Sequence, residues 1–279
     1  MIGRKLELQK ISACIASQRS VLLEGPVGVG KTHLALSATQ AQARSFFRID
    51  GDSRYTEQKL TGWFDPPSVL KKGYVAESFI DGPLVEAMRT GGILFINELN
   101  RLPEGVQNIL LPAIDEKLIH LPRLGTVTAQ PGFVVIATQN PKEFVATSHL
   151  SEAILDRFEL IHIDYQTESE EVAIVMEKIG QTRDTQSLAQ KSVLLVRESR
   201  NHHRIKRGAS VRAAIAIAEL TLALRTTMAD LEESFQAAAY MALPTRIEIH
   251  RESELHQSHH QAVEEVIREL LGHGSEKKK

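Results

Sequence analysis

The sequence predicts an α/β fold, in which a mostly parallel sheet is covered by helices and is followed by a smaller all-helical domain. Five short apolar runs, each typical of a buried strand, alternate with segments of helical composition before residue 165. Beyond Tyr165 only helical segments remain. We therefore expect one domain over residues 1–165 and a second over 166–279, the latter ending in a polar tail.

The first domain is expected to begin with a helix over residues 4–18, where Leu and Ile recur at helical spacing. The predicted strands are apolar runs and cover residues 21–25, 46–50, 91–96, 133–138 and 159–163. A helix over residues 33–43 follows the first strand. Sheets of this kind bind ligands at the carboxyl ends of their strands.

Two segments interrupt this alternation. Residues 51–82 contain the only Trp, together with several Gly and Pro, and are expected to form turns and short strands. Residues 117–132 predict a hairpin around Pro122–Gly125. Trp63 and Phe64 are either an exposed grip on a partner or a local core, and insertions on a rigid sheet commonly carry function.

The second domain is expected to contain only helices, over residues 167–179, 188–200, 211–224, 231–241 and 262–271. His256, His259 and His260 are spaced as neighbours on a helix and could ligate a metal. No set of cysteines and carboxylates accompanies them, and a polar helix face is the interpretation we favour.

Composition excludes several classes of protein. The single cysteine, Cys14, rules out an internal disulfide framework and a zinc site built from several thiolates. The formal net charge of −2 lacks the basic excess of a dedicated nucleic-acid binder, so nucleic acid is not an expected partner. The sequence offers neither an apolar signal core nor a stretch of about 20 apolar residues, so we expect a cytoplasmic protein without membrane insertion.

One motif carries a specific chemistry. The segment GPVGVGKT fits the phosphate-binding pattern G-x-x-x-x-G-K-[ST] and lies between a predicted strand and a predicted helix. Its backbone N–H groups are expected to wrap phosphates, the lysine to meet the β and γ oxygens, and the threonine hydroxyl to ligate Mg²⁺. The predicted ATP-binding residues are Gly25, Pro26, Val27, Gly28, Val29, Gly30, Lys31, Thr32 and His33.

A second site follows the strand ILFI, where Asn97 and Glu98 occupy the positions of the metal-organising acid and the catalytic base. The usual residue at the first position is Asp. Asn97 can orient a magnesium-bound water through its amide oxygen, but it brings no negative charge, so we expect weaker metal binding. Glu98 is the predicted base that polarises the attacking water.

These motifs, in this order, resemble the MoxR branch of the AAA+ ATPases over residues 1–225. The signatures are GPVGVGKT, FINELNR, ATQNP, LDRF and GASVRA. The resemblance implies a P-loop AAA+ core with a five-stranded parallel sheet and an all-α lid. It also implies that Asn140 is a sensor of the γ-phosphate, Arg157 an arginine finger for a neighbouring subunit, and Arg212 a second sensor in the lid.

Each arginine also has a local alternative. Arg157 could pair with Glu159 or Asp156, and Arg212 could cap surface carbonyls. Arg101 is either an interface contact or a residue at a helix entry.

The resemblance implies a hexameric ring that uses ATP and Mg²⁺ to remodel or mature a client protein, often one with a von Willebrand factor A domain. In this branch, the segments 51–82 and 117–132 resemble the helix-2 insert and the pre-sensor hairpin. The alternatives are a slow nucleotide-dependent assembly switch, suggested by Asn97, and a DNA-acting AAA+ protein, which the charge balance disfavours.

Overall fold

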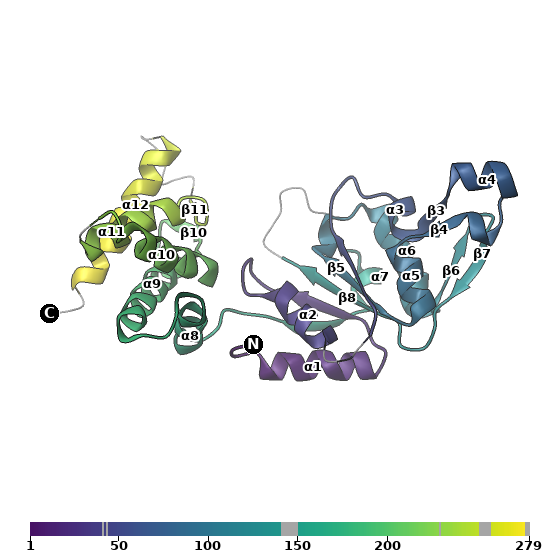
Figure 1. The fold of residues 1–279 in the computed structure, drawn as a ribbon, viewed down its shortest axis with the longest axis horizontal. Helices are drawn as coiled ribbons and strands as arrows, with labels where there is room; N and C mark the ends of the chain where they lie inside the picture. The colour runs from purple at the N-terminus through teal and green to yellow at the C-terminus, as the bar shows by residue number, and fades with distance from the viewer. Residues whose placement is uncertain (41, 43, 141–149, 229, 251–257, 277–279) are drawn as a thin grey trace. The chain divides into compact units, whose positions relative to one another are not determined.

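The computed structural model describes residues 1–279 apart from 41, 43, 141–149, 229, 251–257 and 277–279. The chain divides between Asp164 and Tyr165 into two units (Figure 1). Apart from the first two residues, the first unit covers Gly3–Asp164 and the second Tyr165–Lys279. The two units are described in turn.

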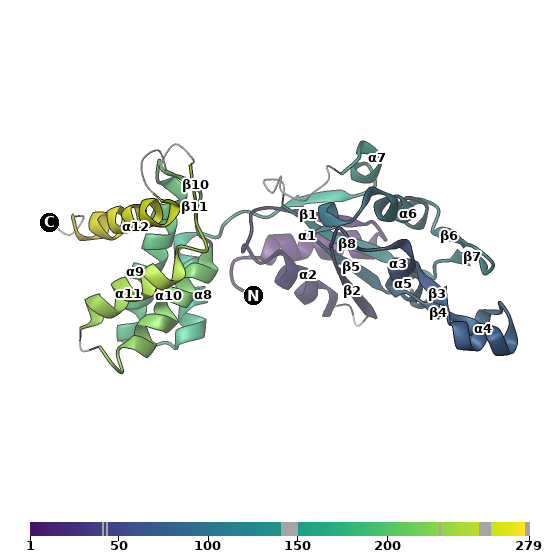
Figure 2. The ribbon, with the colours of Figure 1, turned by 90° about the horizontal axis from the view of Figure 1, so that it is seen from above.

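The first unit is built on a five-stranded sheet in which every neighbouring pair of strands is parallel (Figure 2). The strands lie in the order β2-β5-β8-β1-β9. Their bounds are β1 Val21–Glu24, β2 Phe46–Asp50, β5 Ile93–Asn97, β8 Val134–Gln139 and β9 Glu159–His162. The predicted five-stranded parallel sheet is thereby confirmed, and β1 lies between β8 and β9 so that the phosphate-binding segment leaves the sheet from an interior strand.

Alternation along the strands directs side chains to opposite faces of the sheet. On one face Leu22, Leu94 and Val135 join a buried cluster with residues of α5 and α6. The helix α2 contacts β5 and β8, and it packs with α1. The bounds of these helices are α1 Lys5–Ala16, α2 Lys31–Gln40, α5 Pro83–Thr90 and α6 Glu104–Asp115. The result is an apolar sheet whose polar residues are concentrated where the strands end.

Both predicted insertions contain the expected short strands. The hairpin of β6 and β7 is antiparallel, as predicted, and so is the pair β3 and β4. The first insertion also contains two helices that its composition did not predict. The bounds are α3 Glu57–Thr61, β3 Gly62–Phe64, α4 Pro66–Lys72, β4 Phe79–Asp81, β6 Leu118–Leu121 and β7 Gly125–Thr128.

The two neighbouring aromatic residues of the first insertion differ. Phe64 packs edge-on against Tyr74 and Phe79, with ring centroids 5.1 and 5.0 Å apart. Trp63 is 44% exposed. Phe64 therefore belongs to a local core, whereas Trp63 is exposed to solvent, as a residue that contacts a partner would be.

The second unit is helical, with one departure from the prediction. Its helices are α8 Glu168–Ile179, α9 Arg183–Asn201, α10 Val211–Leu224, α11 Leu231–Ala242 and α12 His259–Glu276. A short antiparallel pair, β10 Ile205–Arg207 with β11 Glu248–Ile249, accompanies them. Helical periodicity could not reveal this pair, because each strand has only two or three residues and the two are far apart in the chain.

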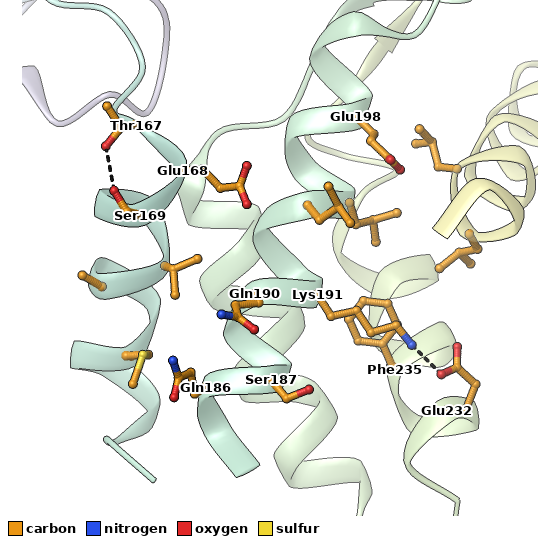
Figure 3. Close-up of a pocket in the computed structure, with 17 residues that line it drawn as sticks. Thr167, Glu168, Ser169, Gln186, Ser187, Gln190, Lys191, Glu198, Glu232 and Phe235 are labelled. Carbon is orange, nitrogen blue, oxygen red and sulfur yellow. Dashed lines mark hydrogen bonds and ion pairs between the residues drawn. The ribbon is translucent and has the colours of Figure 1, made fainter. Parts of the chain in front are cut away.

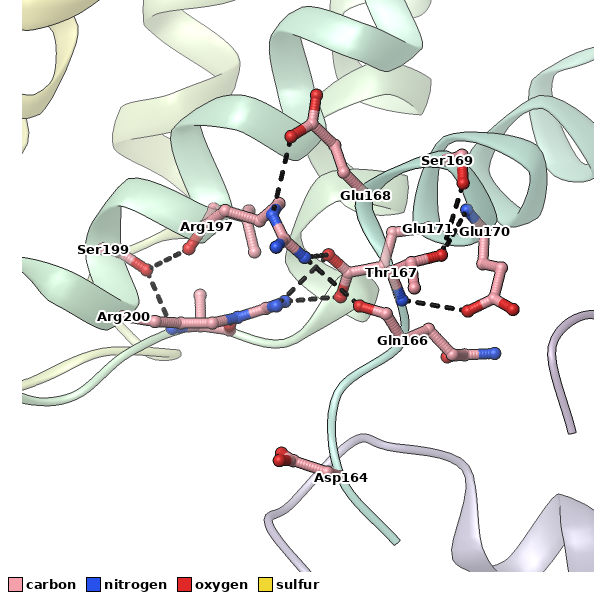
Figure 4. A network of polar contacts seen from close by, with 12 residues as sticks. Asp164, Gln166, Thr167, Glu168, Ser169, Glu170, Glu171, Arg197, Ser199 and Arg200 are labelled. Atoms are coloured by element: carbon pink, nitrogen blue, oxygen red, sulfur yellow. Dashed lines mark hydrogen bonds and ion pairs between the residues drawn. The ribbon is translucent and has the colours of Figure 1, made fainter. Parts of the chain in front are cut away.

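A buried carboxylate lies inside the second unit (Figure 4). The side chain of Glu171 is 2% exposed and forms ion pairs with Arg197, at 3.1 Å, and Arg200, at 2.7 Å. Arg200 also donates to the carbonyl of Ala209 and lies over the ring of Tyr165. A buried charge needs this degree of pairing to be tolerated, so the cluster holds α8 to α9.

The second unit also contains a groove between α8, α9, α11 and α12 (Figure 3). Val172, Met176 and Leu194 contribute apolar surface to its lining. The ammonium of Lys191 pairs with Glu232 and lies 4.2 Å from the centre of the Phe235 ring. Within the described parts of the chain, no helix combines the length and apolar character that a membrane crossing requires.

Candidate functional site

Residues 25–30 of the segment GPVGVGKT form the loop between β1 and α2, as its strand–loop–helix pattern predicted. Gly30, directly before α2, has φ +89°, a left-handed conformation that favours glycine. Val29 is buried, and its carbonyl accepts a hydrogen bond of 3.3 Å from the guanidinium of Arg4. The loop therefore rests on a buried arginine that sequence analysis did not identify.

The two side chains that end the motif lie in the first turn of α2. Lys31 Nζ donates to the carbonyl oxygens of Gly25, at 2.7 Å, and Pro26, at 2.8 Å. The Thr32 hydroxyl donates to Asn97 Oδ1 at 3.1 Å. The following His33 is exposed. The hydrogen bond from Thr32 thus connects the end of the motif directly to the end of β5.

Asn97 is the centre of a polar cluster at the carboxyl ends of the strands. Its Oδ1 accepts hydrogen bonds from the hydroxyls of Thr32 and Thr138, both at 3.1 Å. Its Nδ2 donates to Asp50 Oδ1 at 2.9 Å. Asp50 also pairs with Arg48, whose hydrogen bond is the main cause that lowers the pKa of the Asp50 carboxyl.

Glu98 has a left-handed backbone, with φ 59° and ψ 59°, which is rare for a residue other than glycine. Its N–H donates to the hydroxyl of Thr138 at 2.9 Å. Its carboxylate is 32% exposed and accepts a hydrogen bond of 2.9 Å from Arg101. Strained backbone of this kind is typical of functional sites, and here it turns Glu98 away from the direction of the strand.

The three residues implied by resemblance occupy different surroundings. Asn140 is buried directly after β8, whereas the residues that follow it lie outside the described part of the chain. Arg157 Nε lies 2.6 Å from Asp115 Oδ2, an ion pair whose geometry is not that of a hydrogen bond. Arg212 belongs to the second unit, in the first turn of α10, and is exposed.

The local alternative for Arg157 was wrong in its partner. Glu159 pairs with Arg19, while Arg157 pairs with Asp115, the last residue of α6. The sequence distance of 42 residues between Arg157 and Asp115 explains why the pair was not predicted, since local spacing cannot reveal a contact between two separate elements.

Asp50 and Thr138 join the site without having been predicted as members. Asp50 is the last residue of β2, and Thr138 lies one residue before the end of β8. A detectable signal existed, because both are polar residues at the carboxyl ends of predicted strands.

Comparison with known proteins agrees with this geometry. Residues 20–158 match the family described as AAA domain (dynein-related subfamily). This part of the chain is an AAA domain. It contains β1, the phosphate-binding loop, β2, β5 and β8, and thus every member of the polar cluster around Asn97.

The AAA domain has curated relatives among ATPases. The gas vesicle ATPase GvpN of Haloferax mediterranei is 31% identical, over 77% of this chain and 65% of the relative. GvpN1 of Halobacterium salinarum is 30% identical, over 60% of this chain and 53% of the relative. The chain therefore spans about half to two thirds of the length of these relatives. Both relatives are named as ATPases.

A solved structure has the same fold. RuvB of Thermotoga maritima, in a mutant form, aligns with a TM-score of 0.59 and 18% identity over 86% of this chain and 71% of its own. At this identity the likeness concerns the fold alone, which is that of a P-loop AAA+ protein.

The donor chemistry of the AAA domain fits a nucleotide with magnesium. Thr32 offers a hydroxyl, Asn97 an amide oxygen and Asp50 a carboxylate, and oxygen atoms are the ligands that Mg²⁺ prefers. The loop before α2 supplies backbone N–H groups at a helix N-terminus, where anions bind favourably. The described residues contain no group of three or more His, Cys, Asp or Glu that could hold a metal, and His256 of the histidine cluster lies outside them.

Proposed function

We propose that this chain is a ring-forming ATPase of the MoxR type, which couples ATP hydrolysis to the remodelling or maturation of a partner protein in the cytoplasm. The observation that carries the proposal is the direct hydrogen bond between Thr32 of the phosphate-binding loop and Asn97 at the end of β5. It joins the predicted phosphate and metal residues into one site, with Glu98 next in the chain.

In this proposal each residue has a defined task. Lys31 would leave the carbonyls of its own loop to meet the β and γ oxygens of ATP, and Thr32 and Asn97 would hold the magnesium ion. Bound Mg²⁺ would neutralise charge on the phosphates. Glu98 would accept a hydrogen bond from the attacking water, and Asn140 would contact the γ-phosphate through its amide.

Arg157 and Arg212 complete the proposed site from elsewhere. Arg212 would close on the phosphates of its own subunit, and Arg157 would serve the nucleotide of a neighbour in a hexameric ring. The pair with Asp115 supports a mobile role for Arg157, because a partly exposed ion pair contributes only about 0 to 1 kcal/mol and can be exchanged for another anion.

The partner would be gripped by the first insertion. Its helix α4 contains no buried residue, and Leu70 on that helix is 89% exposed. Trp63 and Tyr74 are also exposed. Several exposed apolar groups on one insertion favour a protein partner, and a von Willebrand factor A domain protein is the candidate that the MoxR resemblance suggests. The near-neutral charge of the chain disfavours DNA.

A slow assembly switch is the second candidate, and Asn97 is the observation that favours it. With an amide at the usual position of an acid, nucleotide binding could drive ring assembly while turnover stays low. A steady-state ATPase rate that is low, together with ATP-dependent assembly, distinguishes the switch from the remodelling enzyme.

The experiment that tests the ring mechanism mixes two inactive proteins. Lys31→Ala keeps its arginine finger, and Arg157→Ala keeps its phosphate loop. After random co-assembly in equal amounts, about a quarter of the interfaces join an intact Lys31 to an intact Arg157. We expect the mixture to hydrolyse ATP faster than the sum of its parts.

The matched control is Arg19→Ala, which removes another arginine that pairs with a carboxylate of the same unit and should be active on its own. Exchange of subunits is verified with a fluorescent label on each variant. If exchange is demonstrated and the mixture stays inactive, Arg157 does not act on a neighbouring subunit.

A further inference from the structure

The amide of Asn97 has a defined orientation, which depends on its neighbours. An ionised carboxylate can only accept hydrogen bonds, so the amide NH₂ must face Asp50. The amide oxygen then faces the hydroxyls of Thr32 and Thr138, which can both donate. Without Asp50, the two ends of the amide are nearly equivalent in shape, and the NH₂ group could rotate toward Thr32.

The backbone holds Asp50 in this position. Asp50 and Asn97 are direct partners in the parallel register of β2 and β5. The N–H of the next residue, Gly51, donates to the carbonyl of Asn97 at 2.7 Å. A Cβ at Gly51 would lie 2.1 Å from the carbonyl oxygen of Glu98, so only glycine permits this approach. The contact between Asp50 and Asn97 is therefore built into the sheet.

Asp50 also carries the negative charge that position 97 lacks. Its Oδ1 accepts from Asn97 and from Arg48, at 2.9 and 2.8 Å, and Arg48 Nε lies 3.2 Å from Oδ2. Arg48 offsets part of that charge. The side chain of Asp50 is 58% exposed, so it remains accessible from solvent.

We propose that Asp50 is a positioning residue that replaces the missing acid of the nucleotide site, by orienting the amide oxygen of Asn97 toward Thr32 and by placing a carboxylate beside it. Two adjacent strands thus share a task that usually belongs to one aspartate. This inference rests on the proposed function, because it concerns magnesium bound with ATP.

The proposal predicts that the acid and the amide can exchange places. Asp50→Asn removes the charge and the constraint on the amide. Adding Asn97→Asp to it returns one carboxylate to the pair, now on β5, with an amide on β2 as its hydrogen-bond partner. The double variant should therefore recover what the single variant loses.

The experiment measures binding of a fluorescent ATP analogue with Mg²⁺ and with EDTA, and it requires no turnover. The quantity compared is the dissociation constant in EDTA divided by the dissociation constant in Mg²⁺. We expect Asp50→Asn to reduce this ratio about tenfold while the affinity in EDTA stays unchanged, and the double variant to return within about threefold of the parent. A tenfold change corresponds to about 1.4 kcal/mol.

Asp52→Asn is the matched control. Asp52 lies two residues further along and pairs with Arg54 as Asp50 pairs with Arg48. It should leave the ratio unchanged. A loss of affinity for Asp50→Asn that is equal in Mg²⁺ and EDTA would indicate a merely structural role and overturn the proposal.

The remaining outcomes separate the two proposals. If the parent binds the analogue with no help from Mg²⁺, both the proposed function and the role of Asp50 are wrong. If the parent depends on Mg²⁺ and Asp50→Asn keeps that dependence, the role of Asp50 alone is wrong. Failure of the double variant to regain the ratio also contradicts the exchange of acid and amide.

Discussion

The carboxylates of Glu171 in the helical unit and Glu98 at the end of the sheet differ in burial and in partners. Glu171 is 2% exposed and pairs with two arginines. Glu98 is 32% exposed, pairs with Arg101 and has a left-handed backbone. One carboxylate has its acceptor capacity filled by protein, whereas the other keeps a face that water can reach.

Under the proposed function, this difference separates a structural charge from a catalytic one. A buried charge with good partners fixes the packing of helices, and its removal leaves its partners uncompensated. A partly exposed charge on strained backbone contributes little to stability and is suited to contact a reactant. Variants of each carboxylate should therefore affect different measurements.

The largest effect is expected for Glu171→Gln. The substitution removes the charge and turns an amide NH₂ toward the guanidinium groups of Arg197 or Arg200. We expect the free energy of unfolding of the helical unit to fall by about 3 kcal/mol. Chemical denaturation followed by circular dichroism measures this change, while the affinity for ATP in the folded protein should stay unchanged.

Glu232→Gln is the control for this prediction. Glu232 is 54% exposed and pairs with Lys191 on the rim of the groove. An exposed pair contributes about 0.2 to 1 kcal/mol, so the unfolding midpoint should move only slightly. Equal losses for the two variants would refute the distinction between buried and exposed carboxylates in this unit.

The next effect is expected for Glu98→Gln, which should keep ATP binding and lower the hydrolysis rate by about two orders of magnitude. The reason is the loss of a group positioned to accept a proton. Steady-state phosphate release measures the rate. Glu104→Gln, an exposed carboxylate in the first turn of α6, is the matched control and should retain full activity. Unchanged turnover in Glu98→Gln would remove Glu98 from the mechanism.

An effect of comparable or smaller size is expected for Lys31→Ala, measured as a change in ATP affinity. A charge-assisted contact of this kind contributes about 1.5 to 3 kcal/mol, so the dissociation constant should rise roughly 10- to 150-fold. Stability should change little, in contrast to Glu171→Gln. Titration with a fluorescent nucleotide gives the constant, and Lys10→Ala on the exposed face of α1 is the control. Binding at the parental affinity would show that the loop is not a phosphate site.

Much of the fold could be predicted because its signals are local. The apolar runs of β1, β5 and β8 and the motif GPVGVGKT are contiguous, so the sheet and its phosphate-binding loop follow from the sequence. The hairpin of β6 and β7 was also predicted from its alternation and its turn. The roles of all the predicted site residues, Lys31, Thr32, Asn97 and Glu98 as well as Asn140, Arg157 and Arg212, stay predictions.

What the sequence could not reveal depends on contacts between distant segments. Asp50 reaches Asn97 only through the register of two parallel strands. Arg157 meets Asp115 only because α6 ends beside the segment that follows α7, Glu152–Leu155. The pair of β10 and β11 is too short for any periodicity to be detected. Each of these requires the three-dimensional arrangement of the chain.

The buried Arg4 connects the phosphate-binding loop to the last residue of the first unit through hydrogen bonds. Its guanidinium donates to the carbonyl of Val29 in that loop and to the carbonyl of Asp164, at 3.3 and 2.5 Å. Asp164 is the residue at which the first unit ends. If Val29 shifts, the guanidinium of Arg4 must either move with it and displace Asp164 or lose one of its two hydrogen bonds. Arg4 therefore couples the position of the phosphate-binding loop to the position of Asp164, where the first unit ends.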